Sequence, residues 1–182
     1  MRGRRAGSGG GIMDLKSLIR DIPDFPKEGI LFKDITPLLA DAEGLQFTVD
    51  KLTAFAQEQR AEAIAGIESR GFLFGVPVAM ALGVPFVPIR KPGKLPAETS
   101  RVEYELEYGT DALEIHTDAV SRGQRVVVID DLLATGGTAA ATAELLKRVG
   151  AEPAGFGFVI ELSFLPGRAQ LGDVPTQALL TY

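Results

Sequence analysis

Two adjacent carboxylates, Asp130 and Asp131, stand between a run of β-branched residues at 126–129 and a loop of small residues at 134–138. The run predicts a buried parallel strand, and the Ala-rich segment 139–149 predicts a helix. A loop that enters a helix presents bare N–H groups and the positive end of the helix dipole to an anion. Two carboxylates can accept hydrogen bonds from the vicinal hydroxyls of a ribose. The pattern therefore predicts a site for a sugar phosphate.

The loop at 134–138 differs from the two common nucleotide-binding loops. It lacks the Gly-Lys-Thr ending of a Walker loop, and no G-x-G-x-x-G pattern follows the strand. A solvated acidic strand end before an ordinary turn is the simpler alternative. The hydrophobic strand, the acid pair and the T-G-G-T sequence disfavour it because they occur together. Glycine lets the backbone approach a phosphate and threonine adds a hydroxyl donor, so we expect contacts from Ala134, Thr135, Gly136, Gly137 and Thr138.

Two basic segments suit a pyrophosphate. Segment 66–72 (G-I-E-S-R-G-F) holds Arg70 at a strand end, where its planar guanidinium can bind the anion. The alternative for this residue is a surface ion pair with Glu68. Segment 90–96 (R-K-P-G-K-L-P) carries three cations, which suit the charge of a departing pyrophosphate. The alternative for this segment is a solvated, charged hairpin, which composition alone does not exclude.

An aromatic stretch near the N-terminus is the fourth signal. Segment 23–37 is a Pro-rich turn and an edge strand, with Phe25 and Phe32 as core or contact aromatics. Packing alone is the simpler explanation of such a stretch.

Together these stretches resemble the type I phosphoribosyltransferases, in the form seen in the adenine phosphoribosyltransferase family. Segment 126–138 is similar to the family's motif for 5-phosphoribosyl-1-pyrophosphate (PRPP), and G-I-E-S-R-G-F is similar to its pyrophosphate loop. R-K-P-G-K-L-P is similar to the opening of its flexible catalytic loop, and 104–109 (Y-E-L-E-Y-G) to the family's Y-x-L-E-Y-G. Segment 25–37 is similar to its adenine-recognising hood. The resemblance covers 13–182, with modest departures at Glu28, Lys33, Phe164 and Pro166.

The resemblance implies conversion of adenine and PRPP to AMP and pyrophosphate, a pentosyltransferase reaction of purine salvage. Glu107 would protonate or deprotonate the purine, and Tyr108 would help to close the loop. A non-proline cis peptide bond is implied between Glu68 and Ser69. The implied pyrophosphate-binding residues are Glu68, Ser69, Arg70, Arg90, Lys91 and Lys94, and the implied adenine-binding residues are Leu31, Phe32, Lys33 and Leu162.

The resemblance also implies partners and leaves two alternatives. Mg²⁺ would enter with PRPP, whose pyrophosphate and hydroxyls need a hard cation, rather than through direct protein ligands. A homodimer is the usual assembly in the family. One alternative is a phosphoribosyltransferase for another purine base, such as xanthine. The other is a PRPP-sensing regulator without catalysis, which the presence of Glu107 and of the basic loop disfavours.

Composition limits the other classes of function. The 182 residues are 46% hydrophobic and 24% charged, which is an ordinary globular balance. The formal net charge of −5 gives no basic signal for nucleic acid. The sequence contains no cysteine, which excludes thiolate metal sites and fits a cytoplasmic protein. Residues 1–12 predict a flexible tail without the apolar middle of a signal peptide.

The elements that position these residues alternate between strands and helices. Strands are expected at 64–67, 84–89, 126–129 and 154–160, and helices at 14–20, 44–59, 72–82 and 139–149. Within the last helix we expect Ala139, Ala143, Leu146 and Val149 to face the core. Segment 71–89 has no charge, but its prolines and glycines break it into a helix and a strand, so no membrane span is expected.

This alternation predicts an α/β fold with a doubly wound, mainly parallel sheet. Ligands of such sheets bind beyond the carboxyl ends of the strands. We expect one phosphoribosyltransferase domain at 13–182, with a small hood from the N-terminal and C-terminal segments (about 13–40 at the N-terminal side) and a flexible catalytic loop at about 90–116.

Overall fold

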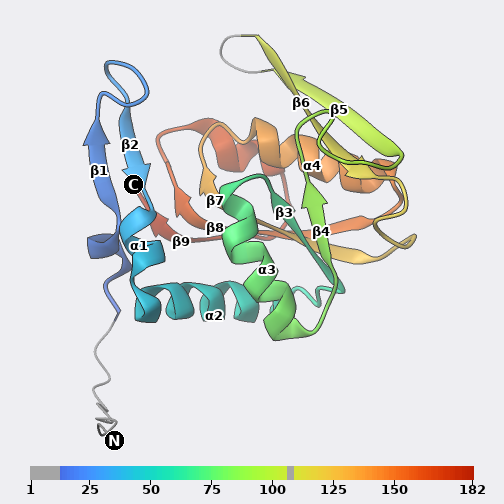
Figure 1. Ribbon diagram of the computed structural model, residues 1–182, viewed down its shortest axis with the longest axis horizontal. Coiled ribbons are helices and arrows are strands. Elements are labelled where there is room, and N and C mark those ends of the chain that lie inside the picture. Colours follow the sequence, from blue (N-terminus) through green and yellow to red (C-terminus); the bar gives the residue numbers. More distant parts are fainter. Residues whose placement is uncertain (1–12, 106–108) are drawn as a thin grey trace, which may run out of the picture. The chain divides into compact units, whose positions relative to one another are not determined.

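The strand that the β-branched run predicted is the central strand of a five-stranded parallel sheet (Figure 1). A computed structural model describes residues 13–105 and 109–182. The order of the strands is β4-β3-β7-β8-β9, and each neighbouring pair is parallel. The predicted α/β class with a parallel sheet is therefore confirmed. The five strands are β3 (Ala63–Ile67), β4 (Phe86–Ile89), β7 (Arg125–Leu133), β8 (Glu152–Glu161) and β9 (Thr176–Thr181).

β7 is covered on both faces because its side chains alternate between two layers. Val126 and Val128 belong to the cluster that also contains Leu145 of the following helix. On the other side, Ile129 lies near Gly157 of β8, where a side chain would collide with it. The four residues at 126–129 are completely buried. A strand buried on both faces reads as a continuous apolar run, which explains why this one was found from sequence.

The opposite, amino-terminal edge of β7 is tied to its neighbours by Arg125. The guanidinium forms an ion pair with Glu152 at the start of β8. Its Nη2 also donates to the carbonyl oxygen of Gln59 at 2.9 Å. The backbone N–H of Arg125 donates to the carboxylate of Glu62 at 2.9 Å. The contacts at the amino-terminal ends of these strands therefore serve to hold the sheet together.

Three long helices accompany the sheet, with α3 and α4 on opposite faces (Figure 1). The side chain of Asp41 accepts a hydrogen bond from the N–H of Gly44 at 2.7 Å and so caps the first turn of α2. Gly83 ends α3 with a φ of 69°, a left-handed value that glycine adopts without strain. The helices are α2 (Ala42–Glu58), α3 (Arg70–Leu82) and α4 (Gly137–Arg148).

The uncharged segment 71–89 contains most of α3 and all of β4, as predicted. Among the described residues, no helix is both long and apolar enough to span a membrane.

The buried face of α4 differs from the predicted one. Ala143 and Val149 are only partly buried, and the face is centred on Thr142 and Leu145. Ala139 and Leu146 are buried as predicted, but the prediction was wrong for Ala143 and Val149, because it followed apolar residues and skipped a threonine. The hydroxyl of Thr142 donates to the carbonyl oxygen of Thr138 at 2.8 Å, so its burial leaves no unpaired donor.

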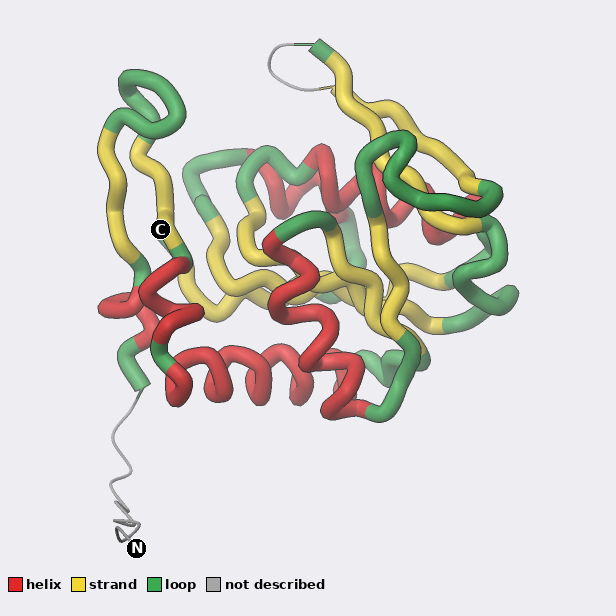
Figure 2. The backbone as a smooth tube through the Cα atoms, in the orientation of Figure 1, coloured by secondary structure: helices red, strands yellow, loops and turns green. Residues whose placement is uncertain are grey.

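Much of the segment predicted as a catalytic loop at 90–116 forms an antiparallel pair of strands, seen as a separate pair in Figure 2. β5 (Thr99–Glu105) pairs with β6 (Thr110–His116). Val102, Leu113 and Ile115 are buried in the same core cluster as α4. That this segment acts as a flexible catalytic loop stays a prediction, and its residues 106–108 lie outside the described residues.

The chain divides into two units, Met1–Phe47 and Thr48–Tyr182, and each is described by itself. The first contains a hairpin and short helices; that 13–182 is one domain with a hood stays a prediction. The predicted helix at 14–20 is wrong, because only four residues form a 3₁₀ turn and the Asp14 side chain makes no capping bond. The elements are η1 (Leu15–Leu18), β1 (Arg20–Pro23), β2 (Leu31–Asp34) and α1 (Thr36–Ala40).

Asp34 links the hairpin of the first unit to the start of α1. Its carboxylate accepts hydrogen bonds from the Thr36 hydroxyl at 2.5 Å and the Thr36 N–H at 2.9 Å, and from Arg20 at 2.6 Å. These bonds, that of the Thr36 hydroxyl first, lower the pKa of Asp34 from 3.8 to about 2. Because the folded pKa lies below the unfolded one, the carboxylate stabilises the fold above about pH 4, and this contribution disappears as the pH falls through about 2.

We expect Asp34→Asn to lower the free energy of unfolding by about 1 kcal/mol at pH 7, because a charge-assisted acceptor is lost. The difference in free energy of unfolding between the wild-type protein and the variant should fall to about half of its pH 7 value near pH 3. Urea unfolding at a series of pH values between 7 and 3 measures this difference. A difference that stays constant over that range would contradict the assignment.

Candidate functional site

A cavity of about 400 Å³ lies at the carboxyl edge of the sheet. The end of β7, the loops after β3 and β7 and the first residues of α3 and α4 supply most of its walls, and single residues after β4 and on β5, β6 and β8 add to them. Parallel strands bring their carboxyl ends to one edge, so residues far apart in sequence meet there. The polar and charged residues that line the cavity are Glu68, Ser69, Arg70, Lys91, Tyr104, Asp130, Asp131, Thr135 and Thr138.

The loop between β7 and α4 has the geometry of an anion site. Gly136 precedes the helix with a φ of 85°, so the backbone turns through the left-handed region that favours glycine. A Cβ atom on Gly136 would lie 2.5 Å from the carbonyl oxygen of Gly167. A Cβ atom on Gly167 would in turn collide with the carbonyl oxygen of Ala134. The short helix η2 (Pro166–Leu171) therefore packs directly against this loop.

Gly167 packs against the loop of the candidate site, and the sequence patterns missed this contact. Its partner, Ala134, lies more than thirty positions away in the chain. The sequence signal that was available is a glycine directly after a proline, which indicates a turn but not what the turn contacts.

The acid pair lies on β7 itself, because the strand continues to Leu133. The prediction that the strand ends before the two carboxylates was therefore wrong. Asp131 is buried, and its Oδ2 lies 3.0 Å from Nε of Arg70. Gly71 makes this approach possible, since a Cβ atom there would lie 2.8 Å from the carbonyl oxygen of Ile129.

Burial sets the protonation of the acid pair. It raises the pKa of Asp130 well above its usual range, and the charge of Asp131 raises it further. Burial also raises the pKa of Asp131, while the Arg70 guanidinium opposes this change. Both shifts act against the charged form of the pair, and both carboxyl groups keep acceptor oxygens for hydroxyl groups.

The loop after β3 contains the predicted cis peptide bond between Glu68 and Ser69, which is confirmed. Oε2 of Glu68 accepts hydrogen bonds from Nε of Arg90 at 2.8 Å and from the N–H of Lys91 at 3.0 Å. Arg70 pairs with Asp131, and Glu68 pairs with Arg90. Glu68 thus fixes the start of the basic loop beside the cavity.

The three cations of the basic loop have different surroundings. Lys91 lines the cavity, whereas Arg90 and Lys94 do not appear in its walls. Arg90 is held by Glu68 and donates to the carbonyl oxygen of Lys94 at 3.3 Å. Lys94 itself is exposed. The structure therefore brings one of the three predicted cations directly to the cavity.

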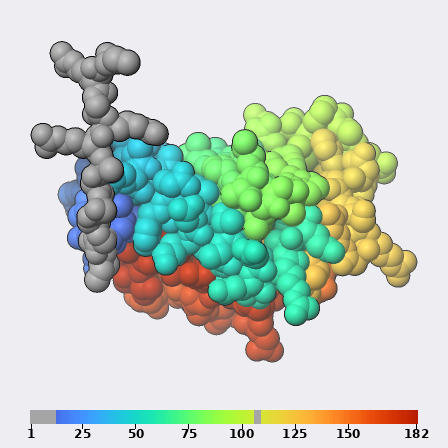
Figure 3. Space-filling view, turned by 90° about the horizontal axis from the view of Figure 1, so that it is seen from below, coloured from blue at the N-terminus to red at the C-terminus, as the bar shows by residue number. Residues whose placement is uncertain are grey.

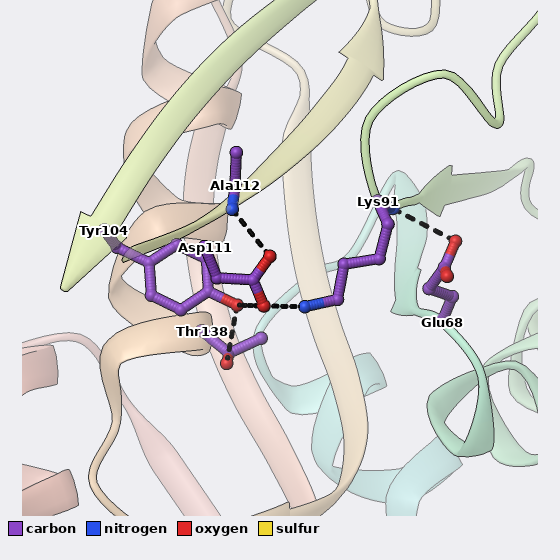
Figure 4. A network of polar contacts seen from close by, with 6 residues as sticks. All are labelled: Glu68, Lys91, Tyr104, Asp111, Ala112 and Thr138. Carbon is purple, nitrogen blue, oxygen red and sulfur yellow. Dashed lines mark hydrogen bonds and ion pairs between the residues drawn. The ribbon is translucent and has the colours of Figure 1, made fainter. Parts of the chain in front are cut away.

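A polar network joins Lys91 to the phosphate loop (Figure 4). Nζ of Lys91 forms an ion pair with Asp111 of β6. The hydroxyl of Tyr104 on β5 donates to Asp111 at 3.3 Å and accepts from the hydroxyl of Thr138 at 3.3 Å. Tyr104 and Asp111 were not among the predicted site residues. They are directly opposite each other in the β5–β6 register, which only the strand pairing reveals.

The residues predicted to bind adenine lie in both units. Most of β2 consists of Leu31, Phe32 and Lys33. The ring centroids of Phe32 and Phe25 lie 5.1 Å apart. Leu162 follows β8 in the second unit, donates its N–H to the carbonyl oxygen of Leu133 at 2.9 Å, and is not among the residues that line the cavity. Because each unit is described by itself, base binding by this set stays a prediction. Glu107 and Tyr108 lie outside the described residues.

Metal ligands are sparse around the cavity. Within residues 13–105 and 109–182, no three His, Cys, Asp or Glu side chains come together to hold a metal ion. Asp130 and Asp131 are hard oxygen donors, but one of them already pairs with Arg70. These few protein donors suit a hard cation that receives most of its oxygen ligands from a bound substrate.

Comparisons with known proteins agree with one another. The family model for the phosphoribosyl transferase domain matches residues 39–165. The adenine phosphoribosyltransferase of Nostoc punctiforme is 59% identical over 172 residues, which cover 93% of this chain and 100% of the relative. The crystal structure of adenine phosphoribosyltransferase from Thermoanaerobacter pseudethanolicus has a TM-score of 0.89 and 54% identity, and the match covers 92% of this chain and 98% of that one.

A third similar structure is a complex with ligands. It is adenine phosphoribosyltransferase from Saccharomyces cerevisiae complexed with D-2,5-dideoxy-2,5-imino-altritol 1,6-bisphosphate and adenine. Its TM-score is 0.87 at 44% identity, and the match covers 91% of this chain and 96% of that one.

Proposed function

The chain belongs to the phosphoribosyltransferase family and, within it, to the adenine phosphoribosyltransferases, and from this membership we propose a task for each part of the cavity. The enzyme converts adenine and PRPP to AMP and pyrophosphate in purine salvage. The observation that carries the assignment of residues is that one cavity contains an acid pair, a helix N-terminus and a lysine. Those three features match the ribose, the 5-phosphate and the pyrophosphate of PRPP.

The 5-phosphate binds at the loop from Ala134 to Thr138. This assignment is supported by the left-handed Gly136, which turns the chain so that successive N–H groups precede α4. Thr135 and Thr138 line the same cavity and add hydroxyl donors, while Gly137 begins the helix.

The ribose binds at the acid pair. Asp130 and Asp131 are adjacent on β7 and both line the cavity. Burial raises the pKa of both groups, and the Arg70 guanidinium lies beside Asp131, so the negative charge of the pair is opposed where an anionic substrate binds. Each carboxyl group can still accept a hydrogen bond from a ribose hydroxyl.

The pyrophosphate binds between the loop after β3 and the basic loop after β4. Arg70 and Lys91 line the cavity and supply positive charge. Ser69 supplies a hydroxyl, and Glu68 contributes by holding Arg90 and the backbone of Lys91. Arg90 and Lys94 belong to the same loop and add to its positive potential.

Phosphoribosyltransferases generally use Mg²⁺ together with PRPP. We assign the ion to the oxygens of PRPP, because the described residues lack a cluster of protein ligands. When bound, magnesium neutralises charge on the departing pyrophosphate.

In the reaction, N9 of adenine forms a bond to C1 of the ribose while the bond from C1 to the pyrophosphate oxygen breaks. The leaving oxygen keeps the electron pair, and the base loses one proton. Positive charge develops on the ribose as the C1–O bond weakens. Arg70 and Lys91 stabilise the negative charge that leaves, and the acid pair orients the ribose beside them.

The base and its proton are assigned from the family resemblance. Phe32 and Leu162 take opposite faces of adenine, and the backbone of Leu31 and Lys33 reads its edge. A backbone reader discriminates an amine from an oxo group because a mismatch leaves a buried donor or acceptor unpaired. Glu107 exchanges the proton of the purine, and Tyr108 helps to close the loop over it.

The test of function is a direct assay with each purine base. We expect the protein, with Mg²⁺ and PRPP, to form AMP from adenine at least about 100-fold faster than it forms a nucleotide from hypoxanthine, guanine or xanthine. Separation of the nucleotides by chromatography measures this ratio. Faster reaction with xanthine would instead support the enzyme for another base, and PRPP binding without any product would support a regulator.

We also propose that the enzyme is a cytoplasmic homodimer. The absence of cysteine supports the location. A row of apolar side chains on the outer side of α3 supports self-association, and this part of the second unit lies at the surface in Figure 3. The row consists of Leu73, Val76 and Met80. Sedimentation velocity measures the mass in solution.

A further inference from the structure

The ammonium group of Lys91 has a fixed partner outside the cavity walls. Lys91 lines the cavity, and its Nζ forms an ion pair with Asp111 on β6. Asp111 is not among the residues that line the cavity. Its influence on a bound ligand therefore passes through the side chains that it contacts.

Asp111 is itself held from three directions (Figure 4). Its Oδ1 accepts a hydrogen bond from the N–H of Ala112 at 2.8 Å. Its Oδ2 accepts from the hydroxyl of Tyr104 at 3.3 Å and from Lys91. Tyr104 in turn accepts from Thr138 of the phosphate loop at 3.3 Å. One carboxylate thus connects a residue of the pyrophosphate end to a residue of the phosphate end.

This arrangement bears on how Lys91 can meet an anion. A lysine side chain has a flexible stem, and ordering it opposes binding. The backbone of Lys91 is fixed by Glu68, and its ammonium is fixed by Asp111, so both ends of the stem are restrained before any ligand arrives. An ammonium has three N–H donors, and an ion pair with one carboxylate leaves donors for a second anion.

An isolated surface ion pair would contribute little. The pair here differs because both partners have further restraints and because Lys91 and Tyr104 line the cavity. The Arg101–Glu103 pair on the same hairpin has none of these features, since both side chains are at least half exposed.

We propose that Asp111, supported by Tyr104, is a positioning residue that holds the Lys91 ammonium in the cavity for the pyrophosphate group of PRPP. This inference rests on the proposed assignment of Lys91 to pyrophosphate. Asp111 does not touch the substrate. It acts by restricting the conformations of the Lys91 side chain, whose ammonium contacts the substrate. The alternative is a purely structural role in joining β5 to β6.

A double-mutant cycle separates the two roles. Steady-state kinetics with Mg²⁺ are measured for Lys91→Met, Asp111→Ala and the double variant, first with PRPP varied at saturating adenine and then with adenine varied at saturating PRPP. We expect Asp111→Ala to raise the KM for PRPP about 10-fold and to leave the KM for adenine within about twofold. In the Lys91→Met background the same change should raise the KM for PRPP by less than about twofold, because its target is gone.

Two further variants support the cycle. Tyr104→Phe keeps the ring and removes the hydroxyl, and we expect a KM for PRPP about threefold higher that also depends on Lys91. Glu103→Ala removes the partner of Arg101 on the same hairpin and should leave both KM values unchanged. If Asp111→Ala does not fold, Asp111→Asn and Tyr104→Phe carry the same cycle.

The outcomes are distinct. An equal factor for the Asp111 change in both backgrounds, or a lower KM for PRPP, would overturn the positioning role. A normal KM for PRPP in Asp111→Ala beside a raised one in Lys91→Met would overturn this inference and leave the proposed function intact. A normal KM in Lys91→Met would remove the pyrophosphate assignment of Lys91, and the inference with it.

Discussion

Replacing Asp130 and Asp131 together by asparagine is expected to lower kcat/KM for PRPP by about 100- to 10,000-fold. Two carboxylates that accept hydrogen bonds from ribose hydroxyls contribute about 1.5–3 kcal/mol each, and about 1.4 kcal/mol corresponds to a factor of ten. Both changes are made together, because either carboxyl group alone could still accept a hydrogen bond from the ribose. The affinities for PRPP and AMP should fall together, since both ligands carry the same ribose.

Titration calorimetry with PRPP and with AMP measures the two affinities, and initial rates give kcat/KM. Glu152→Gln is a suitable control, because Glu152 pairs with Arg125 at the other edge of the sheet. We expect that variant to bind both ligands normally. Unchanged affinity of the Asp130→Asn/Asp131→Asn protein for both ligands would remove the ribose assignment.

Gly136→Ala is expected to weaken PRPP binding by about 100-fold or more. The change costs about 1–2 kcal/mol for an L-residue in the left-handed region. It also places a methyl group 2.5 Å from the carbonyl oxygen of Gly167, and this contact is with backbone, which cannot rotate away. The phosphate loop must therefore shift away from η2, and its N–H groups then no longer converge on the phosphate.

The same helix offers a matched control in Gly150. It follows the C-terminus of α4 with a φ of 89°, but a Cβ atom there would have no neighbour closer than 3.7 Å. Gly150→Ala should therefore carry the conformational cost of about 1–2 kcal/mol in the free energy of unfolding without a change in PRPP affinity. Urea unfolding and titration calorimetry on both variants separate the two effects. Equal PRPP affinity in the two variants would contradict the packing argument.

The parts of the fold that the sequence predicted well are those with local causes. The β-branched run at 126–129 predicts β7 because a strand buried on both faces needs apolar residues throughout. The predicted helix at 44–59 corresponds to α2, whose first turn is capped by Asp41. The acid pair and the glycine-threonine loop were found for the same reason, since strand, acids, loop and helix are consecutive in the chain.

The parts that were missed depend on contacts between distant segments. Nothing in the sequence near Asp111 indicates that it faces Tyr104 and Lys91, because strand register and the path of the basic loop decide this. The contact between Gly167 and Ala134 is of the same kind. Thr142 was missed because a periodicity of apolar residues does not register a threonine whose hydroxyl bonds to its own helix.

The separation of the two sheet edges has a consequence for engineering. The ligand cavity uses only the carboxyl edge, whereas Arg125 joins Glu62, Gln59 and Glu152 at the other. Thermal stability and PRPP binding should therefore respond to different sets of substitutions. Directed evolution could first increase the thermal stability around Arg125 and then change ligand binding, with little interference between the two sets of substitutions.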